Sequence, residues 1–286
     1  MHISLQYILR LLLVGVCVSL MGCGGEPASQ GQGYAPASGG RRAVTVAAAA
    51  DLKYVLDEIV DRFHQEHPEI RVEVVYGSSG NLYAQIAQGG PYDLFLSADI
   101  DYPRQLIKAG RADRESEFLY AVGQIVVWVP EGSKLDLQRR GIEALLDPSV
   151  RKIAIANPRH APYGRAAEAA LKALGVYERV EGRLVLGENI AQTTQFVDTG
   201  AADIGIIALS LALSPPMRGR GQIWHVPTDT YPPLVQGGVV VAGSRDQDAA
   251  GRLRQFLNGA EGRDLLKRYG FVLPGESITW IGRRPG

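Results

Sequence analysis

The sequence predicts an α/β protein of two lobes, each a mainly parallel sheet flanked by helices, joined by crossing hinge strands. The chain has 286 residues, 46% of them hydrophobic, which is enough for two cores. From residue 42 onward, strand patterns alternate with helical patterns, as is typical of βαβ units. The alternation forms two series, with a helical segment left over at the end. We therefore expect residues 42–120 and 235–286 to form lobe 1 and residues 121–234 to form lobe 2.

The first series begins with a buried strand at 43–49 (AVTVAAA). A helix over 52–64 follows, because Val55, Ile59 and Phe63 recur at helical spacing and make one apolar face. The remaining predicted elements of this series are strands at 71–76 and 93–97 and helices at 81–88 and 102–109.

The second series begins with a long strand at 121–129 (AVGQIVVWV), which Pro130 ends. The later predicted elements are strands at 152–156, 183–186, 203–208 and 235–242 and helices at 164–174, 190–199, 247–257 and 262–269. We expect the chain to cross between the lobes near 119–123 and again near 227–235. The C-terminal helices would then return to complete lobe 1.

The charges are balanced, with 30 Lys and Arg residues against 30 Asp and Glu residues. A nucleic-acid-binding protein carries a basic stripe that collects phosphates, and none is visible here. We therefore expect no nucleic-acid partner.

The N-terminus has the pattern of a secretory signal. An apolar run at 11–20 is too short for a membrane span and ends at Leu20-Met21-Gly22-Cys23. This ending resembles the lipobox of bacterial lipoproteins, which implies cleavage after residue 22 and acylation of Cys23. Residues 23–41, rich in Gly, Ala, Ser, Pro and Gln, read as a flexible tether. We expect an extracytoplasmic, membrane-anchored lipoprotein; the alternative is a plain signal peptide with an incidental cysteine.

Four loops share one design, in which a strand ends, small or polar residues follow and a helix begins. They are Ala50-Asp51 and the segments 77–81, 160–164 and 187–190. Such loops gather beyond the carboxyl ends of parallel strands, and the N–H groups of a helix start suit an anion. Ser78 and Ser79 add hydroxyl donors. Each loop alone would be read as a helix cap, but four together predict an anion site between the lobes.

Five segments carry a specific resemblance to a known family. They are VAAAADL at 46–52, GSSGNLYAQI at 77–86, PYDLFLSAD at 91–99, NPRHAPYG at 157–164 and LKRYGF at 266–271. Together they resemble the periplasmic molybdate-binding proteins of ABC transporters, among the bacterial extracellular solute-binding proteins, over about residues 43–271. The resemblance implies a periplasmic-binding-protein fold without catalytic activity. It also implies a monomer that carries molybdate, and tungstate as well, to an ABC permease in the inner membrane.

The resemblance implies that neutral hydroxyl and main-chain N–H donors hold the oxyanion. Carried over by position, the donors are Asp51, Ser79, Tyr163 and Ile190. Further ligand-binding positions are Ser78, Ala50 and Ala208. No cofactor and no resident metal are implied, because molybdenum enters only as molybdate through these residues.

Two positions depart from the family pattern. Some members have a tyrosine where this chain has Ala208, so its hydroxyl is missing and Tyr163 is a candidate to supply one instead. A carboxylate at Asp51 would repel a dianion unless it turned away to cap the helix at Leu52 and left its N–H for the ligand. The alternatives are that Asp51 accepts a proton from an anion such as hydrogen phosphate, or joins the coordination sphere of a larger metal centre.

The same residues leave other ligands and other classes of protein open. Tungstate, sulfate and phosphate are the alternative oxyanions. Sulfate shares the charge and tetrahedral shape of molybdate, so cavity size is what distinguishes the two. An extracytoplasmic α/β hydrolase is the rival class, yet Asn81 stands where a nucleophile elbow has glycine. A sensor or adhesion module would bind no small ligand.

Overall fold

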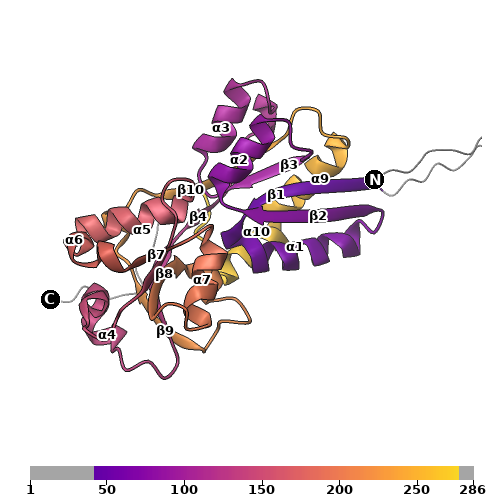
Figure 1. Cartoon of the computed structure of the whole chain (residues 1–286). Helices are drawn as coiled ribbons and strands as arrows, with labels where there is room; N and C mark the ends of the chain where they lie inside the picture. Colours follow the sequence, from indigo (N-terminus) through magenta and orange to yellow (C-terminus); the bar gives the residue numbers. More distant parts are fainter. Residues whose placement is uncertain (1–41, 277–286) are drawn as a thin grey trace, which may run out of the picture. The chain divides into compact units, whose positions relative to one another are not determined.

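The computed structural model describes residues 42–276 and contains two five-stranded sheets, each flanked by helices (Figure 1). The predicted signal segment 1–22, the acylation site Cys23 and the tether 23–41 lie outside the described residues. Within 42–276, no helix is both long and apolar enough to span a bilayer. The two-lobed α/β architecture expected from the sequence is confirmed.

The first sheet has the strand order β2-β1-β3-β10-β4. Its strands are β1 (Arg42–Ala49), β2 (Ile70–Gly77), β3 (Leu94–Ser97), β4 (Phe118–Gly123) and β10 (Leu234–Val240). Its helices are α1 (Lys53–Glu66), α2 (Ser79–Ala87), α3 (Asp101–Lys108), α9 (Gln247–Asn258) and α10 (Ala260–Arg268). Strand β1 runs parallel to β2 and β3, whereas β10 runs antiparallel to β3 and β4.

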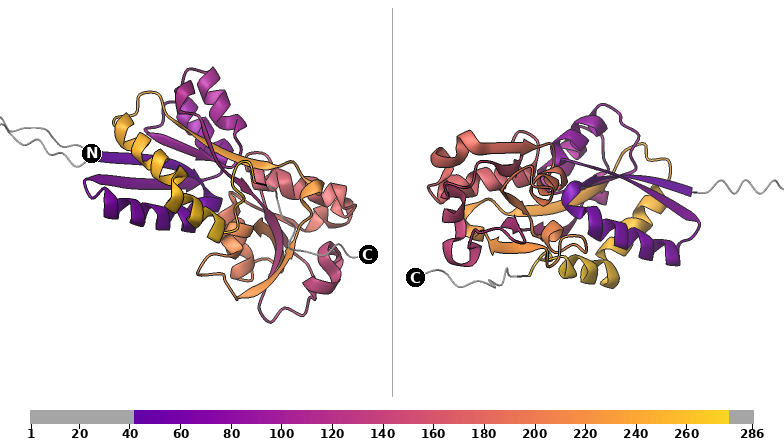
Figure 2. Two further views of the ribbon diagram at one scale, coloured as in Figure 1. Left: turned by 180° about the vertical axis from the view of Figure 1, so that it is seen from behind. Right: turned by 60° about the horizontal axis from the view of Figure 1, so that its bottom comes forward.

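Alternate residues of β1 serve two cores, as the two-residue period of a strand requires. Val44 and Val46 face a core with α1, α9 and α10. Ala47 faces a second core with α2 and α3. The C-terminal helices therefore complete the first lobe, where Figure 2 shows them beside α1 and β1.

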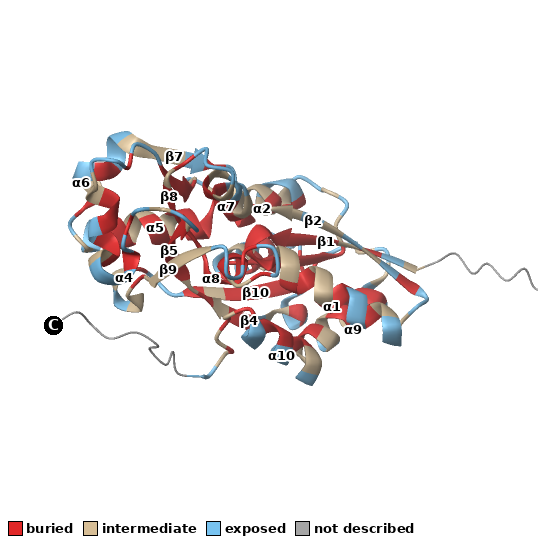
Figure 3. Ribbon diagram, turned by 90° about the horizontal axis from the view of Figure 1, so that it is seen from below, coloured by how far each residue is buried: buried red, intermediate tan, exposed pale blue. Residues whose placement is uncertain are grey.

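The second sheet has the order β7-β6-β8-β5-β9. Strand β5 runs opposite to the other four strands, which all point the same way. Its strands are β5 (Ile125–Pro130), β6 (Ile153–Ala156), β7 (Leu184–Gly187), β8 (Ile204–Ala208) and β9 (Gly221–His225). Its helices are α4 (Leu137–Arg140), α5 (Pro162–Ala173), α6 (Tyr177–Val180), α7 (Ile190–Asp198) and α8 (Leu209–Ala212). Helix α5 covers one face and α7 and α8 cover the other. In Figure 3 the strands of both sheets are largely buried and the outer helix faces are exposed.

The predicted strand at 121–129 is wrong as a single element. It is two strands in different sheets, β4 ending at Gly123 and β5 starting at Ile125. Gln124 between them belongs to neither: its carbonyl accepts from Leu209 N and its side chain donates to the Gly270 carbonyl. Apolar patterning continues through the junction, so it cannot reveal that the chain changes sheets there.

Of the helices that begin earlier than predicted, α2 and α5 are the two at the candidate site. Helix α2 starts at Ser79 because Ser78 takes the extended conformation of an N-cap residue. Helix α5 starts at Pro162, since the fixed φ of proline suits the first helical position. Ser79 and Tyr163 thus lie in first helical turns rather than in loops. Strand β9, at the edge of its sheet, was not predicted.

Candidate functional site

The four loops lie where strands end and helices begin, at the carboxyl ends of β1, β2, β6 and β7. A 3₁₀ turn, η1 (Ala50–Leu52), follows β1 and leads into α1, while α2, α5 and α7 follow the other three strands. Ala50 of the first lobe belongs to the same buried cluster as Tyr163, Ile190 and Ala208 of the second. The structure therefore brings these predicted positions together across the lobes.

Three of the helix starts present main-chain N–H groups without intrahelical partners. The first N–H groups of any helix lack such partners, and this applies to Ser79, Tyr163 and Ile190. In α7 the Asn189 side chain accepts from the next two N–H groups, those of Ala191 and Gln192. The cap therefore satisfies its neighbours and leaves the Ile190 N–H for a ligand.

The two serines of the second loop have different partners. Ser79 Oγ accepts a hydrogen bond of 3.0 Å from Ala98 N, so its own proton is available to an anion. Ser78 Oγ lies 2.9 Å from His160 Nδ1, which engages it across the lobes. Ser79 is thus the better placed hydroxyl donor.

Asp51 is buried, with 1% of its surface exposed, and it does not cap the helix. Its Oδ2 accepts from the Tyr163 hydroxyl at 3.0 Å and from Gln236 Nε2 at 2.7 Å. The expected cap at Leu52 is therefore wrong, because donors from α5 and β10 outcompete the local backbone. The main chain of Asp51 is held too, since Ser210 Oγ donates to its carbonyl at 2.8 Å.

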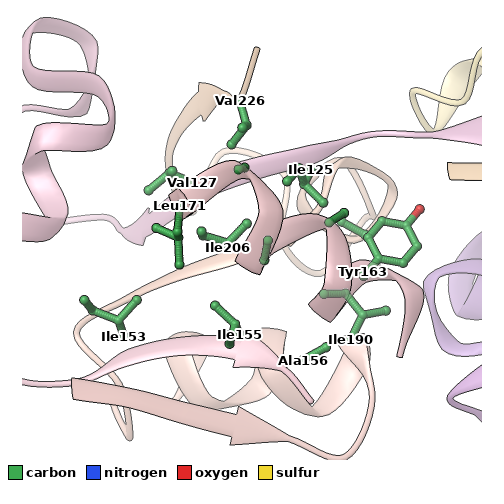
Figure 4. Close-up of a cluster of buried hydrophobic side chains, with 14 of the residues drawn as sticks. Ile125, Val127, Ile153, Ile155, Ala156, Tyr163, Leu171, Ile190, Ile206 and Val226 are labelled. Atoms are coloured by element: carbon green, nitrogen blue, oxygen red, sulfur yellow. The ribbon is translucent and has the colours of Figure 1, made fainter. Parts of the chain in front are cut away.

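Burial governs the acid–base properties of the Asp51 carboxyl group and of its partner Tyr163. Desolvation raises the pKa of Asp51 to about 6, against the opposing effect of the Gln236 and Tyr163 hydrogen bonds. Burial, with the Asp51 charge as a smaller cause, also raises the pKa of Tyr163 well above its ordinary value. The phenol therefore stays protonated and remains a donor. In Figure 4 its hydroxyl points away from the isoleucine and valine side chains around it.

The hydroxyl missing at Ala208 is not replaced by Tyr163, because that hydroxyl donates to Asp51. Sequence reasoning missed Gln236 and Ser210, which fix Asp51. Gln236 had a signal: it is the single strongly polar side chain in the strand LVQGGVV and it is fully buried. Ser210 had none, because serine is common after a strand.

Further contacts join the two lobes around the loops. Gly80 N donates to the His160 carbonyl at 2.9 Å, and a Cβ at Gly80 would lie 2.7 Å from that oxygen. Arg165 Nη2 forms an ion pair of 2.6 Å with Asp99 Oδ2. These contacts hold the second loop of lobe 1 and the turn between β3 and α3 against the start of α5.

The donors suit an oxyanion rather than a metal ion. Across the described part of the chain, no group of three or more His, Cys, Asp or Glu side chains is placed to hold a metal. Helix starts of both lobes share one buried cluster instead, and among residues 42–276 no Lys, Arg or His side chain is bonded to Asp51 or Ser79. Such a set binds an anion through aligned dipoles and requires a closed, dry site.

The comparisons with known proteins all point to one family. The model of the family described as bacterial extracellular solute-binding protein matches residues 44–272. Molybdate-binding protein ModA of Rhodobacter capsulatus is 36% identical over 83% of this chain and 90% of that protein. ModA of Azotobacter vinelandii is 33% identical over 94% of this chain and 100% of that protein. The solved periplasmic molybdate-binding protein of Azotobacter vinelandii superposes with a TM-score of 0.76 at 31% identity, covering 81% of this chain and 99% of that one.

Proposed function

The chain belongs to the bacterial extracellular solute-binding protein family, and we propose that it is the solute-binding component of a molybdate ABC transporter. Members of this family bind and deliver a solute outside the cytoplasm and do not catalyse a reaction. Similarity to molybdate-binding relatives over most of the chain supports molybdate as the solute. The single observation in the structure that supports it best is the meeting of helix starts from both lobes at Ala50, Tyr163 and Ile190.

For the site itself, we propose that main-chain N–H groups of Asp51, Ser79, Tyr163 and Ile190 and the Ser79 hydroxyl hold the oxyanion. Three of these N–H groups lie in the first turns of α2, α5 and α7, and the fourth lies in η1. The N–H groups of α2, α5 and α7 each add the positive end of a helix dipole to a neutral hydrogen bond. Ser78 and Ala208 are the further positions proposed for this region, and Ser78 Oγ contacts His160 Nδ1.

Tungstate is proposed as a second ligand, because it shares the charge and the tetrahedral shape of molybdate. The test is calorimetric titration of the purified chain with molybdate, tungstate, sulfate and phosphate at one pH. We expect molybdate and tungstate to bind and sulfate to give no heat. Flat titrations with molybdate and tungstate would contradict the proposal, and preference for sulfate or phosphate would replace molybdate with that anion.

We also propose that Cys23 is acylated and tethers a monomeric binding protein to the membrane beside its permease. The apolar run that ends in Leu-Met-Gly-Cys and the Gly-, Ala- and Ser-rich segment after it support this. In cell fractionation, Cys23→Ser should move the chain from the membrane fraction to the soluble fraction. A chain that stays soluble with Cys23 intact would contradict the anchor.

A further inference from the structure

The hydrogen-bond network around Asp51 has more acceptors than donors. Tyr163 offers one O–H and Gln236 two N–H groups, and they are used on Asp51 Oδ2 and on the Tyr163 oxygen. Asp51 Oδ1 and Gln236 Oε1 are buried and have no partner. An ionised carboxylate with one orphaned oxygen in a dry site is costly. A single proton placed on Oδ1 would turn that oxygen from an unsatisfied acceptor into a donor.

Among residues 42–276, no opposite charge stabilises an ionised Asp51. The titratable groups that face it are two phenols, Tyr163 on α5 and Tyr120 on β4, and burial, with the negative charge of Asp51 as a smaller cause, raises the pKa of both. Both phenols therefore resist ionisation beside it and remain neutral. Neither provides a positive charge.

The remaining elements against Asp51 contribute uncharged groups. These are Ser210 of α8, whose hydroxyl donates to the Asp51 carbonyl, and Gln236 of β10. On α1, Lys53 lies 3.1 Å from Asp57 and forms its ion pair there. Within residues 42–276, no Lys, Arg or His side chain makes a hydrogen bond or ion pair with Asp51.

We propose that Asp51 holds the bound dianion as a neutral carboxylic acid, with its proton on Oδ1 as a hydrogen-bond donor, so that capture takes up one proton from solvent. This inference rests on the proposed function. A dianion brought to the start of η1 would repel an ionised carboxylate and favour its protonation. The balance is one dianion, one ionised Asp51 and one solvent proton giving a complex in which Asp51 is uncharged.

A neutral Asp51 also has a consequence for selectivity. The groups proposed to bind the ligand are then N–H and O–H donors, which match the four bare oxygens of a fully deprotonated dianion. Monohydrogen phosphate carries an O–H that needs an acceptor, and a protonated Asp51 with Oδ2 already engaged offers none. The expected selectivity is therefore against phosphate, whereas an ionised Asp51 would accept its proton and favour it.

The test is the affinity for sodium molybdate between pH 5.5 and 8.5, with proton uptake measured by calorimetry in buffers of different ionisation enthalpy. Above about pH 6, Asp51 of the free protein is ionised and must take up a proton when molybdate binds. The Kd for molybdate should therefore rise about tenfold per pH unit. Close to one proton should be taken up per molybdate at pH 7.5. The raised pKa of Asp51 places the start of this dependence near pH 6.

The informative variant is Asp51→Asn. An amide can accept the Tyr163 and Gln236 bonds with its oxygen and donate with its nitrogen, which reproduces the neutral acid without titration. We expect its Kd to be independent of pH and its proton uptake to fall to zero. The matched control is His160→Gln, because His160 contacts Ser78 Oγ at the same group of loops. This control should retain the pH dependence.

The outcomes separate this inference from the proposed function. Absence of molybdate binding at every pH would refute the function. Binding with a constant Kd and no proton uptake would leave the function intact and overturn the inference. The inference is also overturned if Asp51→Asn keeps the pH dependence or if His160→Gln loses it.

Discussion

The Tyr163 hydroxyl of the second lobe donates a 3.0 Å hydrogen bond to Oδ2 of Asp51 in the first lobe. Both side chains are buried, and Gln236 Nε2 donates to Asp51 Oδ2 and to the Tyr163 hydroxyl oxygen. The elements η1, α5 and β10 therefore meet at one buried point. Closure of the lobes and the charge of Asp51 are therefore coupled, because one of the two donors that stabilise its carboxylate, Tyr163, comes from the other lobe.

Removing this donor should shift the pH dependence of binding. The Tyr163 bond lowers the pKa of Asp51, so Tyr163→Phe should raise that pKa and move the onset of the Kd increase above pH 6. The free energy of unfolding should fall by about 1 kcal/mol. Molybdate titrations across pH measure the first effect, with Tyr269→Phe, whose hydroxyl contacts Glu58, as the control. An unchanged onset would contradict the prediction.

Protonation of Asp51 should stabilise the ligand-free folded protein in mild acid. The folded-state pKa of about 6 lies above the ordinary 3.8, so the stabilising protonation is complete below about pH 4 and is lost as pH rises through 6. About two pKa units correspond to about 3 kcal/mol. Asp51→Asn should therefore raise the free energy of unfolding at pH 7.5 by up to that amount and change it little at pH 4.

Denaturant unfolding at the two pH values measures this difference. The control is Asp229→Asn, an exposed aspartate whose replacement should change stability by less than about 0.5 kcal/mol at either pH. Equal effects of Asp51→Asn at pH 4 and pH 7.5 would show that Asp51 does not titrate as described.

Loss of the Ser79 hydroxyl should weaken molybdate binding without unfolding the protein. A hydrogen bond to a charged group contributes about 1.5–3 kcal/mol, so Ser79→Ala should raise the Kd about 10- to 100-fold. Ser149→Ala is the matched control, because Ser149 is exposed and precedes β6, at the opposite end of that strand from the site. A Kd within twofold of that of the unsubstituted protein would show that the Ser79 hydroxyl does not bind molybdate.

Gly80 permits the close approach of the lobes. A methyl group there would lie 2.7 Å from the His160 carbonyl and 2.9 Å from the Tyr102 hydroxyl, so Gly80→Ala should hinder closure. We expect at least tenfold weaker molybdate binding with an unchanged fold by circular dichroism. Gly251→Ala in α9 has open space around it and should bind normally. Normal binding by Gly80→Ala would show that this approach is not needed.

The Arg165–Asp99 ion pair should contribute modestly to closure. Both side chains are partly exposed, at 40% and 28%, so solvent screening limits the pair to about 0.2–1 kcal/mol. Arg165→Gln should therefore raise the Kd only a few-fold, with the difference shrinking at high salt. Arg62→Gln removes an ion pair with Glu261 inside lobe 1 and should leave the Kd unchanged. A salt-independent loss would point to packing rather than charge.

Local patterns in the sequence were sufficient for the two-lobed α/β plan. Helical spacing at Val55, Ile59 and Phe63 identified the apolar face of α1, which is buried as expected. The four loops, each small or polar between a strand and a helix, identified where an anion could lie. These signals are local because hydrophobic period and turn chemistry depend on neighbouring residues.

Only the tertiary structure decided where the chain changes sheets and what Asp51 contacts. The change at Gln124 lies inside one apolar run, and its hydrogen bonds reach Leu209 and Gly270, far along the chain. Asp51 could have capped its own helix, as its residue type favours. Gln236 and Tyr163, 185 and 112 residues away, take its carboxylate instead. Residue type thus set which bonds Asp51 can make, and the closing of two lobes around it selected among them, because its donors come from distant segments.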